Sequence, residues 1–439
     1  MEPIELPWGR GETLSLRIPP SWRVITQSNP SLPEPISDLP AAIRAGLGHP
    51  IGLPPLHELV GPKTRIALVM DDASRPTPVH RLAPTVLDYL IEAGAEPENI
   101  TGLFAIGTHR VMSSEEMRAR AGSAVVSRIA CHSFDCHDKE AFVYLGETRR
   151  GTSVILSRIA VEADLRILIG TIEPHPQAGF GGGFKNLLPG LAGAKSIGHN
   201  HLLMPSAKRY NMIGTLPEDN PMRLDLEEAG RMIGGPTFIV NVVLGPRLQP
   251  VAVVCGDAVA AHRAGLKIAR RIYGIELPHQ VDVVISSAHP LDQDLRQAGK
   301  GVLNVAGACR PGGVIVGFLR CEQGLGNVSL PRFLPALSPL RTLVRVMGSR
   351  GLAFLTRHLP GMAPEDRFLI NFALQMLKDY HVLIFSPRLK RAAQGRFPPV
   401  LYDDQERLFG EVIRLLGRHA PQVAVFYQGG VSFPVLASE

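Results

Sequence analysis

Three short apolar segments, each followed by a polar loop, restrict the fold of this 439-residue chain more than any other feature. They cover residues 65–70, 100–106 and 164–170. Runs of this length and composition fit buried strands. In open α/β sheets, ligands bind beyond the carboxyl ends of the strands. We therefore predict an α/β fold whose binding site is built by the three loops.

The loop after the third segment is the richest in reactive groups. Pro174 and Pro176 hold the backbone extended around His175, and a run of three glycines precedes Phe184 and Lys185. Consecutive glycines let backbone N–H groups approach a ligand closely, and a glycine turn before a helix is a good anion cradle. The loop therefore predicts an anion site beside a lysine.

Charged and basic residues also follow the other segments. Asp72 and Arg75 come after the first segment, and His109 comes after the second. An arginine can bind an anion through two hydrogen bonds while a carboxylate orients that anion or a sugar hydroxyl. His199 and His201 follow the glycine run. Because loops after neighbouring strands face one crevice, we expect these side chains to converge.

A second α/β unit begins at the apolar segment 281–287. The helix expected after it carries Arg296, Gln297 and Lys300, and the last two are three residues apart, so they share a helix face. Further strands are expected at residues 313–319, 381–385 and 423–427.

The chain is thus predicted to form two α/β domains, residues 1–275 and 276–439. Each is expected to hold a sheet flanked by helices, with the active site in the cleft between them. A return of the last strand to the first domain is left open. The segment 324–366 is punctuated by proline and glycine, and we interpret it as a lid or an interface.

Local signals assign some element boundaries. Asp38 before Pro40 is typical of a helix N-cap. Ser113 and Glu116 form a capping-box pattern at the start of another helix. Residues 237–255 alternate around a Gly-Pro pair and predict a hairpin.

Composition excludes several classes of protein. The net charge of +6 is diffuse, and aromatic residues make up only 6%, so nucleic acid is not an expected partner, whereas small anionic substrates are. The five cysteines include no CxxC pair, which argues against a disulfide framework or a zinc ribbon and favours the cytoplasm. No apolar run reaches about 18 residues, so no membrane span is expected.

Five motifs together resemble the nickel-pincer lactate racemase family over most of the chain. DDASRPTP at 71–78 matches the family's DDxTRPTP, with Ser74 in place of threonine. GTHR at 107–110 matches directly, and QAGK at 297–300 matches a Gln-x-x-Lys of the second domain. The remaining two matches are PHPQAGFGGGFKNLLPGLAG at 174–193 and NHLLM at 200–204.

The resemblance implies a nickel-pincer nucleotide cofactor, a pyridinium-3,5-bisthiocarboxylic acid mononucleotide. Lys185 corresponds to the lysine that is linked to it, His201 to the nickel ligand, and His109 and His175 to the acid/base pair. The implied cofactor-binding residues are Lys185, Asp72, Arg75, Gly181, Gly182 and Gly183. The implied substrate-binding residues are Arg75, Arg296, Gln297 and Lys300. Implied partners are a 2-hydroxy acid and the proteins that make the cofactor, and a homo-oligomer is left open.

The implied reaction is racemisation or epimerisation of a 2-hydroxy acid through a 2-oxo acid. Direct abstraction of the weakly acidic Cα proton is difficult, and hydride transfer avoids it. Each enantiomer needs its own base, which requires two histidines on opposite sides. Lactate-processing members have a tyrosine at the position of Arg296 and a tryptophan in the second domain, whereas both tryptophans here, Trp8 and Trp22, are N-terminal. We therefore hypothesise that Arg296 accommodates a larger or more anionic acid.

Three other interpretations stay open. A zinc-dependent hydrolase could use His109, His175 and His201 as ligands with an open fourth position. A pyridoxal phosphate enzyme could use Lys185 as its Schiff base. A non-catalytic carrier of the nickel cofactor would need Lys185 and His201 but neither His109 nor His175. The presence of both latter histidines favours catalysis.

Overall fold

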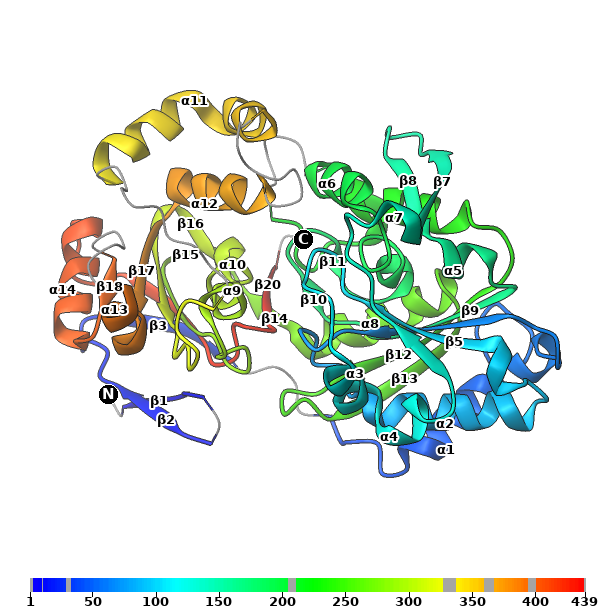
Figure 1. Ribbon diagram of the computed structural model, residues 1–439. Coiled ribbons are helices and arrows are strands. Elements are labelled where there is room, and N and C mark those ends of the chain that lie inside the picture. The colour runs from blue at the N-terminus through cyan, green and yellow to red at the C-terminus, as the bar shows by residue number, and fades with distance from the viewer. Residues whose placement is uncertain are drawn as a thin grey trace.

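The computed structural model describes residues 3–9, 11–28, 33–203, 211–326, 337–358, 367–393 and 400–437. Two six-stranded sheets dominate it, and Figure 1 shows them in two lobes lying side by side. The predicted α/β fold with a sheet and flanking helices in each half is confirmed.

The first sheet has the strand order β13-β12-β9-β4-β5-β6. All its neighbours are parallel except β12 and β13, which form the predicted hairpin. Every residue of β9 and β12 is buried, as expected for strands covered on both faces. The strands are β4 Ile66–Asp71, β5 Ile100–Ala105, β6 Ala130–His132, β9 Leu165–Thr171, β12 Thr237–Leu244 and β13 Pro250–Asp257.

Helices cover both faces of this sheet because its side chains alternate. In β4, Leu68 packs with helices α1 and α2 on one face, and Val69 packs with α6 and α7 on the other. The predicted caps Asp38 and Ser113 both accept hydrogen bonds from their helices. The helices of this lobe are α1 Leu39–Gly48, α2 Val79–Glu92, α3 Ser114–Ala121, α4 Ser123–Val126, α5 Arg158–Glu162, α6 Ala194–Leu202, α7 Pro221–Arg231 and α8 Ala260–Tyr273. Short strand pairs add β7 Phe142–Glu147 with β8 Ser153–Ser157, and β10 Pro174–His175 with β11 Gly179–Phe180.

The second sheet has the order β18-β17-β16-β15-β19-β3 and is parallel throughout. Its strands are β3 Arg23–Ser28, β15 Val281–Ser287, β16 Cys309–Phe318, β17 His381–Phe385, β18 Leu401–Tyr402 and β19 Gln422–Phe426. Its helices are α9 Leu295–Ala298, α10 Lys300–Leu303, α11 Leu337–Arg357, α12 Arg367–Asp379, α13 Pro387–Ala393 and α14 Gln405–Leu416. Figure 1 shows α11 above α12 at the top of this lobe. The rest of the predicted lid or interface, outside residues 324–326 and 337–358, lies beyond the described residues.

The N-terminal strands correct the predicted domain division. β3 hydrogen-bonds to β19 of the second sheet, and the hairpin of β1 Ile4–Pro7 with β2 Thr13–Leu16 packs on that sheet through Leu6 and Leu16. The division at residue 275 had placed these strands in the first domain. An edge strand of a parallel sheet can come from any part of the chain, because only its hydrogen bonds and apolar face are needed.

The last strand joins the two lobes. β20 Phe433–Leu436 pairs in parallel with β14 Gly274–Leu277. Phe433 also packs edge-on against Phe180 of the first lobe, with ring centroids 5.8 Å apart. The C-terminal segment therefore contacts the first lobe although most of its neighbours in sequence belong to the second.

Candidate active site

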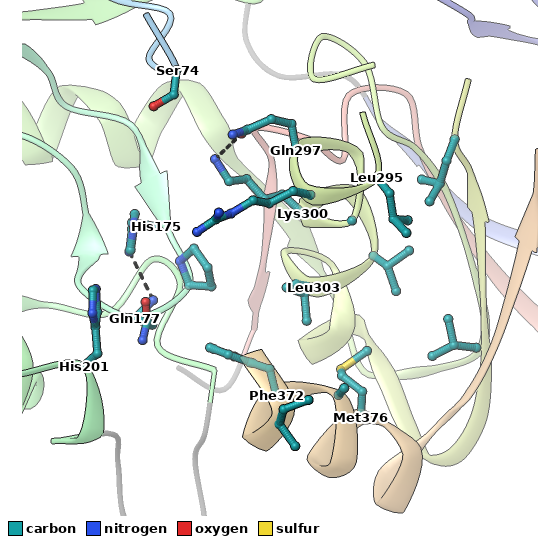
Figure 2. A pocket seen from close by; sticks show the side chains of 18 of the residues that line it. Ser74, His175, Gln177, His201, Leu295, Gln297, Lys300, Leu303, Phe372 and Met376 are labelled. Carbon is teal, nitrogen blue, oxygen red and sulfur yellow. Dashed lines mark hydrogen bonds between the residues drawn. The ribbon is translucent and has the colours of Figure 1, made fainter. Parts of the chain in front are cut away.

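A cavity of about 980 Å³ lies where the two lobes meet. The first lobe contributes the loops after β4, β5 and β9, and the second contributes α9, α10 and α12. Figure 2 shows His175 and His201 on one wall and Gln297 and Lys300 on the opposite wall. The predicted site residues on this cavity are Asp72, Arg75, His109, His175, Gly181, Gly182, Lys185, His201, Arg296, Gln297 and Lys300. The structure thus brings together every predicted site residue except Gly183.

Strand order explains the convergence on the first-lobe side. β4 lies between β5 and β9, and all three are parallel, so their carboxyl ends share one edge of the sheet. Asp72 directly follows β4, and His109 lies in the turn after β5. His175 lies in β10, close after β9.

His109 forms a dyad with a buried carboxylate. Its Nδ1 lies 2.6 Å from Asp72 Oδ2, and the hydroxyl of Ser74 donates to Asp72 Oδ1 at 2.7 Å. Burial works to raise the pKa of Asp72, but the hydrogen bond and charge of His109, with the charge of Arg75, hold this pKa below its usual value. Asp72 is therefore ionised and keeps a proton on Nδ1 of His109. The Nε2 atom of His109 is then the one that can accept a proton.

His175 has the opposite arrangement. Its Nδ1 accepts from the backbone N–H groups of Gln177 and Ala178, at 3.3 and 3.2 Å. A neutral ring held this way carries its proton on Nε2. Burial, followed by the positive charges of Lys185 and Arg75, holds the pKa of His175 well below its usual value. In this state His175 is a neutral N–H donor, whereas His109 is poised to accept.

Lys185 is a buried amine in the short helical turn Gly183–Asn186. Burial and then the charge of Arg75 hold its pKa well below the usual lysine value. It forms no ion pair with the part of the chain that the structure describes. A lowered pKa makes it easier for this amine to lose its proton and act as a nucleophile, which suits a covalent bond to a cofactor.

The glycine run serves packing more than anion binding. The N–H of Gly181 donates to the carbonyl of Glu173 at 2.7 Å, and that of Gly183 donates to Asn241 Oδ1 at 2.8 Å. Gly182 has a φ of +72°, and a Cβ there would lie 2.6 Å from the same Asn241 oxygen. The predicted anion cradle is therefore wrong for Gly181 and Gly183, because their N–H groups already donate to acceptors within the protein. Gly183 faces Asn241 rather than the cavity.

His201, rather than His199, faces the cavity. It lies on α6 and is buried, and burial followed by the charges of Lys185 and Arg296 lowers its pKa to about 3. A neutral imidazole is the form that binds metals. His199 is exposed, and its Nδ1 lies 2.8 Å from the hydroxyl of Thr152. Met204, the last residue of the NHLLM motif, lies outside the described residues.

Cations outnumber the acids that neutralise them on the cavity wall. Arg75 pairs with Glu173 at 3.3 Å. The amine of Lys300 donates to Gln297 Oε1 at 2.7 Å (Figure 2), and burial with the charge of Arg75 lowers the pKa of Lys300 to about 8. Arg296 has no ion-pair partner within the described ranges. The wall therefore suits an anionic ligand.

Two cavity residues were missed in the sequence. Glu173 immediately precedes the Pro-His-Pro stretch and fixes Arg75. Gln177 follows that stretch, lines the cavity and donates its N–H to His175. Their position beside the motif was the only signal, because neither belongs to a metal or acid/base pattern by itself.

Comparison with known proteins identifies the family. A model described as the lactate racemase N-terminal domain matches residues 8–212. A lactate racemase of Thermoanaerobacterium thermosaccharolyticum is 31% identical over 342 residues, which are 77% of this chain and 79% of the relative. A lactate racemase of Lactiplantibacillus plantarum is 32% identical over 291 residues, 65% of this chain and 67% of the relative. The chain belongs to the lactate racemase family.

Solved structures confirm the fold of this family member. The lactate racemase apoprotein from T. thermosaccharolyticum superposes with a TM-score of 0.82 at 23% identity, covering 99% of this chain and 100% of that one. A protein from Thermotoga maritima gives a TM-score of 0.64 at 18% identity, covering 92% and 100%. The predicted family is confirmed, and with it the assignment of the chain as an isomerase of the racemase class.

The zinc-hydrolase interpretation loses its geometric basis. In the described ranges, the His, Cys, Asp and Glu groups that could share a metal are limited to Asp135, Cys136 and His137, with ligand atoms within 4.8 Å of one another. His109, His175 and His201 line one cavity but are not gathered at that spacing.

No helix in the described part of the chain is long and apolar enough to cross a membrane.

Proposed function

We propose that this chain racemises or epimerises a 2-hydroxy acid through a 2-oxo acid intermediate, with a nickel-pincer nucleotide as cofactor. The observation that carries the proposal is the pair of unequal histidines, His109 with its carboxylate and His175 with its amide donors, on one cavity with Lys185 and His201. The names of the relatives support a hydroxy acid as substrate.

The residues present fit the cofactor. The buried amine of Lys185, whose pKa is lowered, suits a covalent link to the pincer, and the neutral imidazole of His201 suits nickel beside soft sulfur donors. A cavity of about 980 Å³ has room for a nucleotide and a small acid together. When bound, the cofactor would take up and return the hydride.

The protein's own groups would handle the proton and the carboxylate. His109 would accept the hydroxyl proton at Nε2 while Asp72 stabilises the imidazolium that forms. Lys300 and Arg75 would hold the substrate carboxylate, and the planar 2-oxo acid would keep both faces open. For the other enantiomer, His175 must accept the proton at Nε2, which requires its own proton to move to Nδ1 and displaces the two amide contacts.

The test uses protein made together with the cofactor biosynthesis proteins. Chiral chromatography of 2-hydroxy acids should show interconversion, and mass spectrometry should find an adduct on the peptide that contains Lys185. Lys185→Arg should lose the adduct and the activity, whereas Lys195→Arg, an exposed lysine on α6, should keep both.

Other results would point to the remaining interpretations. A bound adduct without turnover of any hydroxy acid would favour a cofactor carrier. Sensitivity to borohydride with the absorbance of a Schiff base would favour pyridoxal phosphate. Neither result is compatible with the racemase proposal.

A further inference from the structure

The cavity has two chemically different ends. The charged end holds the residues described above. The other end is apolar, and it is lined by Leu295, Val302, Leu303, Phe372, Met376 and Leu377. Figure 2 shows Leu303, Phe372 and Met376 below Lys300, on the part of the cavity wall formed by α10 and α12.

One short helical segment supplies groups to both ends. Lys300 and Leu303 are the first and last residues of α10, and the Lys300 amine, with Gln297, marks the charged end. Leu303 faces the end closed by α12, which carries Phe372 and Met376. If Lys300 holds the carboxylate of the substrate, the substituent on the substrate Cα would therefore reach the apolar wall.

The size of the cavity exceeds what lactate needs. Its volume of about 980 Å³ is near the top of the range of roughly 300 to 1,000 Å³ that is typical of small-molecule sites. If Lys185 and His201 hold the nucleotide at the charged end, the methyl group of lactate covers little of the apolar end. A ligand gains affinity with every methylene group that covers apolar surface otherwise left in contact with water.

We propose, on the basis of the proposed function, that the substrate is a 2-hydroxy acid with an extended apolar side chain, an alkyl chain or an aryl group, that lies along this wall. A second carboxylate directed toward the apolar end would face Leu303 and Phe372, because Arg75, Arg296 and Lys300 belong to the charged end. Farther along the cavity, one guanidinium nitrogen of Arg341 donates to the Tyr380 carbonyl, and Arg414 pairs with Glu411. The apolar end thus favours a longer side chain over a second carboxylate.

The first experiment measures kcat/KM of the holoenzyme on lactate, 2-hydroxybutyrate, 2-hydroxyhexanoate, 2-hydroxyoctanoate, 3-phenyllactate, malate and 2-hydroxyglutarate. We expect kcat/KM to rise by up to about fourfold per added methylene group, and the dicarboxylic acids to be poor substrates. If lactate or a dicarboxylic acid is the best substrate, this inference fails while the racemase proposal stands.

A binding measurement separates the two proposals. Calorimetric titration with 2-hydroxyoctanoate and with lactate does not depend on turnover. Tighter binding of the longer acid without turnover would reject the racemase proposal and keep the apolar subsite. Equal or weaker binding of the longer acid would overturn the subsite whether or not the enzyme turns over.

A pair of variants locates the subsite. Leu303→Trp should fill the apolar end and lower kcat/KM for 2-hydroxyoctanoate at least tenfold more than for lactate. Leu343→Trp is the matched control, since Leu343 is 55% exposed on α11 and does not line the cavity. Equal losses on both substrates for Leu303→Trp, with a folded protein by circular dichroism, would overturn the assignment.

Discussion

At the scale of single residues, the two histidines differ in what each Nδ1 atom meets. Nδ1 of His109 faces a carboxylate oxygen of Asp72, whereas Nδ1 of His175 faces the two backbone amides of Gln177 and Ala178. A carboxylate stabilises the protonated ring, and amide donors stabilise the neutral one. The same side chain is therefore held in opposite tautomers on the two sides of the cavity.

Asp72→Asn tests the dyad. The amide cannot stabilise an imidazolium, and it allows the wrong tautomer of His109, so we expect kcat to fall by about 10²- to 10⁴-fold. Asp88→Asn is the matched control, because Asp88 pairs with Arg128 away from the cavity. Steady-state kinetics with an intact unfolding transition would check it. A kcat close to that of the unchanged enzyme would rule out the dyad as the base.

Lys300 gives a prediction about pH. Its pKa of about 8 means that it is charged at neutral pH and loses its charge as the pH rises through about 8. If it holds the substrate carboxylate, KM should increase above about pH 8 with little change below. Lys300→Arg should keep KM flat over this range, because the guanidinium stays protonated. A KM that is independent of pH in the unchanged enzyme would contradict this role.

At the scale of elements, a buried carboxylate anchors the helix that carries His201. Asp225 on α7 is fully buried and accepts from the hydroxyls of Thr148 and Thr152 and from Asn200 of α6, at 2.5, 2.8 and 2.7 Å. Asn200 directly precedes His201. The asparagine of the NHLLM motif thus acts as a tether between two helices, which its place in the motif alone does not reveal.

Asp225→Ala should weaken this anchor. Three buried donors would lose their acceptor, so we expect the free energy of unfolding to fall by at least about 3 kcal/mol. Denaturant unfolding measures this, and nickel content at matched folded protein reports whether His201 is still positioned. Asp219→Ala, at an exposed site shortly before α7, is the control. A loss of less than about 1 kcal/mol would show that the network is not structural.

At the scale of the whole molecule, each end of the chain contacts the lobe to which its neighbours in sequence do not belong. β3 closes one edge of the second sheet, and Phe433 packs on Phe180 of the first lobe. The cavity likewise joins distant parts of the chain, since its walls include both Asp72 and Phe372.

Three buried histidines link the stability of the cofactor-free protein to pH. Burial holds the pKa values of His175 and His262 well below the usual value and lowers the pKa of His201 to about 3. Below about pH 6.5 the unfolded chain takes up these protons and the folded chain does not, so stability should fall by up to about 1.4 kcal/mol per pH unit for each group. Burial raises the pKa of Asp71, so this carboxyl opposes the loss of stability on acidification. Urea unfolding from about pH 7.5 to about pH 5 measures the slope.

A histidine variant provides the comparison. His262→Asn should reduce the slope, and His57→Asn, at an exposed position, should leave it unchanged. Stability that is constant or increases on acidification would contradict the prediction.

The sequence by itself determined the local elements and the chemistry near each strand end. The central strands β4, β5 and β9 and the caps Asp38 and Ser113 follow from periodicity and hydrogen-bonding preferences over a few residues. The motifs likewise placed reactive side chains in loops, because such signals are contained within short stretches. The family followed from the same motifs.

Only the tertiary structure decided which distant groups meet. That β3 joins the second sheet, that Glu173 fixes Arg75 and that Asn241 takes the N–H of Gly183 each depend on contacts between residues far apart in the chain. The sequence likewise does not show that α12 contributes an apolar wall to the cavity, because residues 367–379 have the pattern of any amphipathic helix. The reason is physical: local preferences act over one or two turns, whereas cavities and proton affinities are set by packing between lobes.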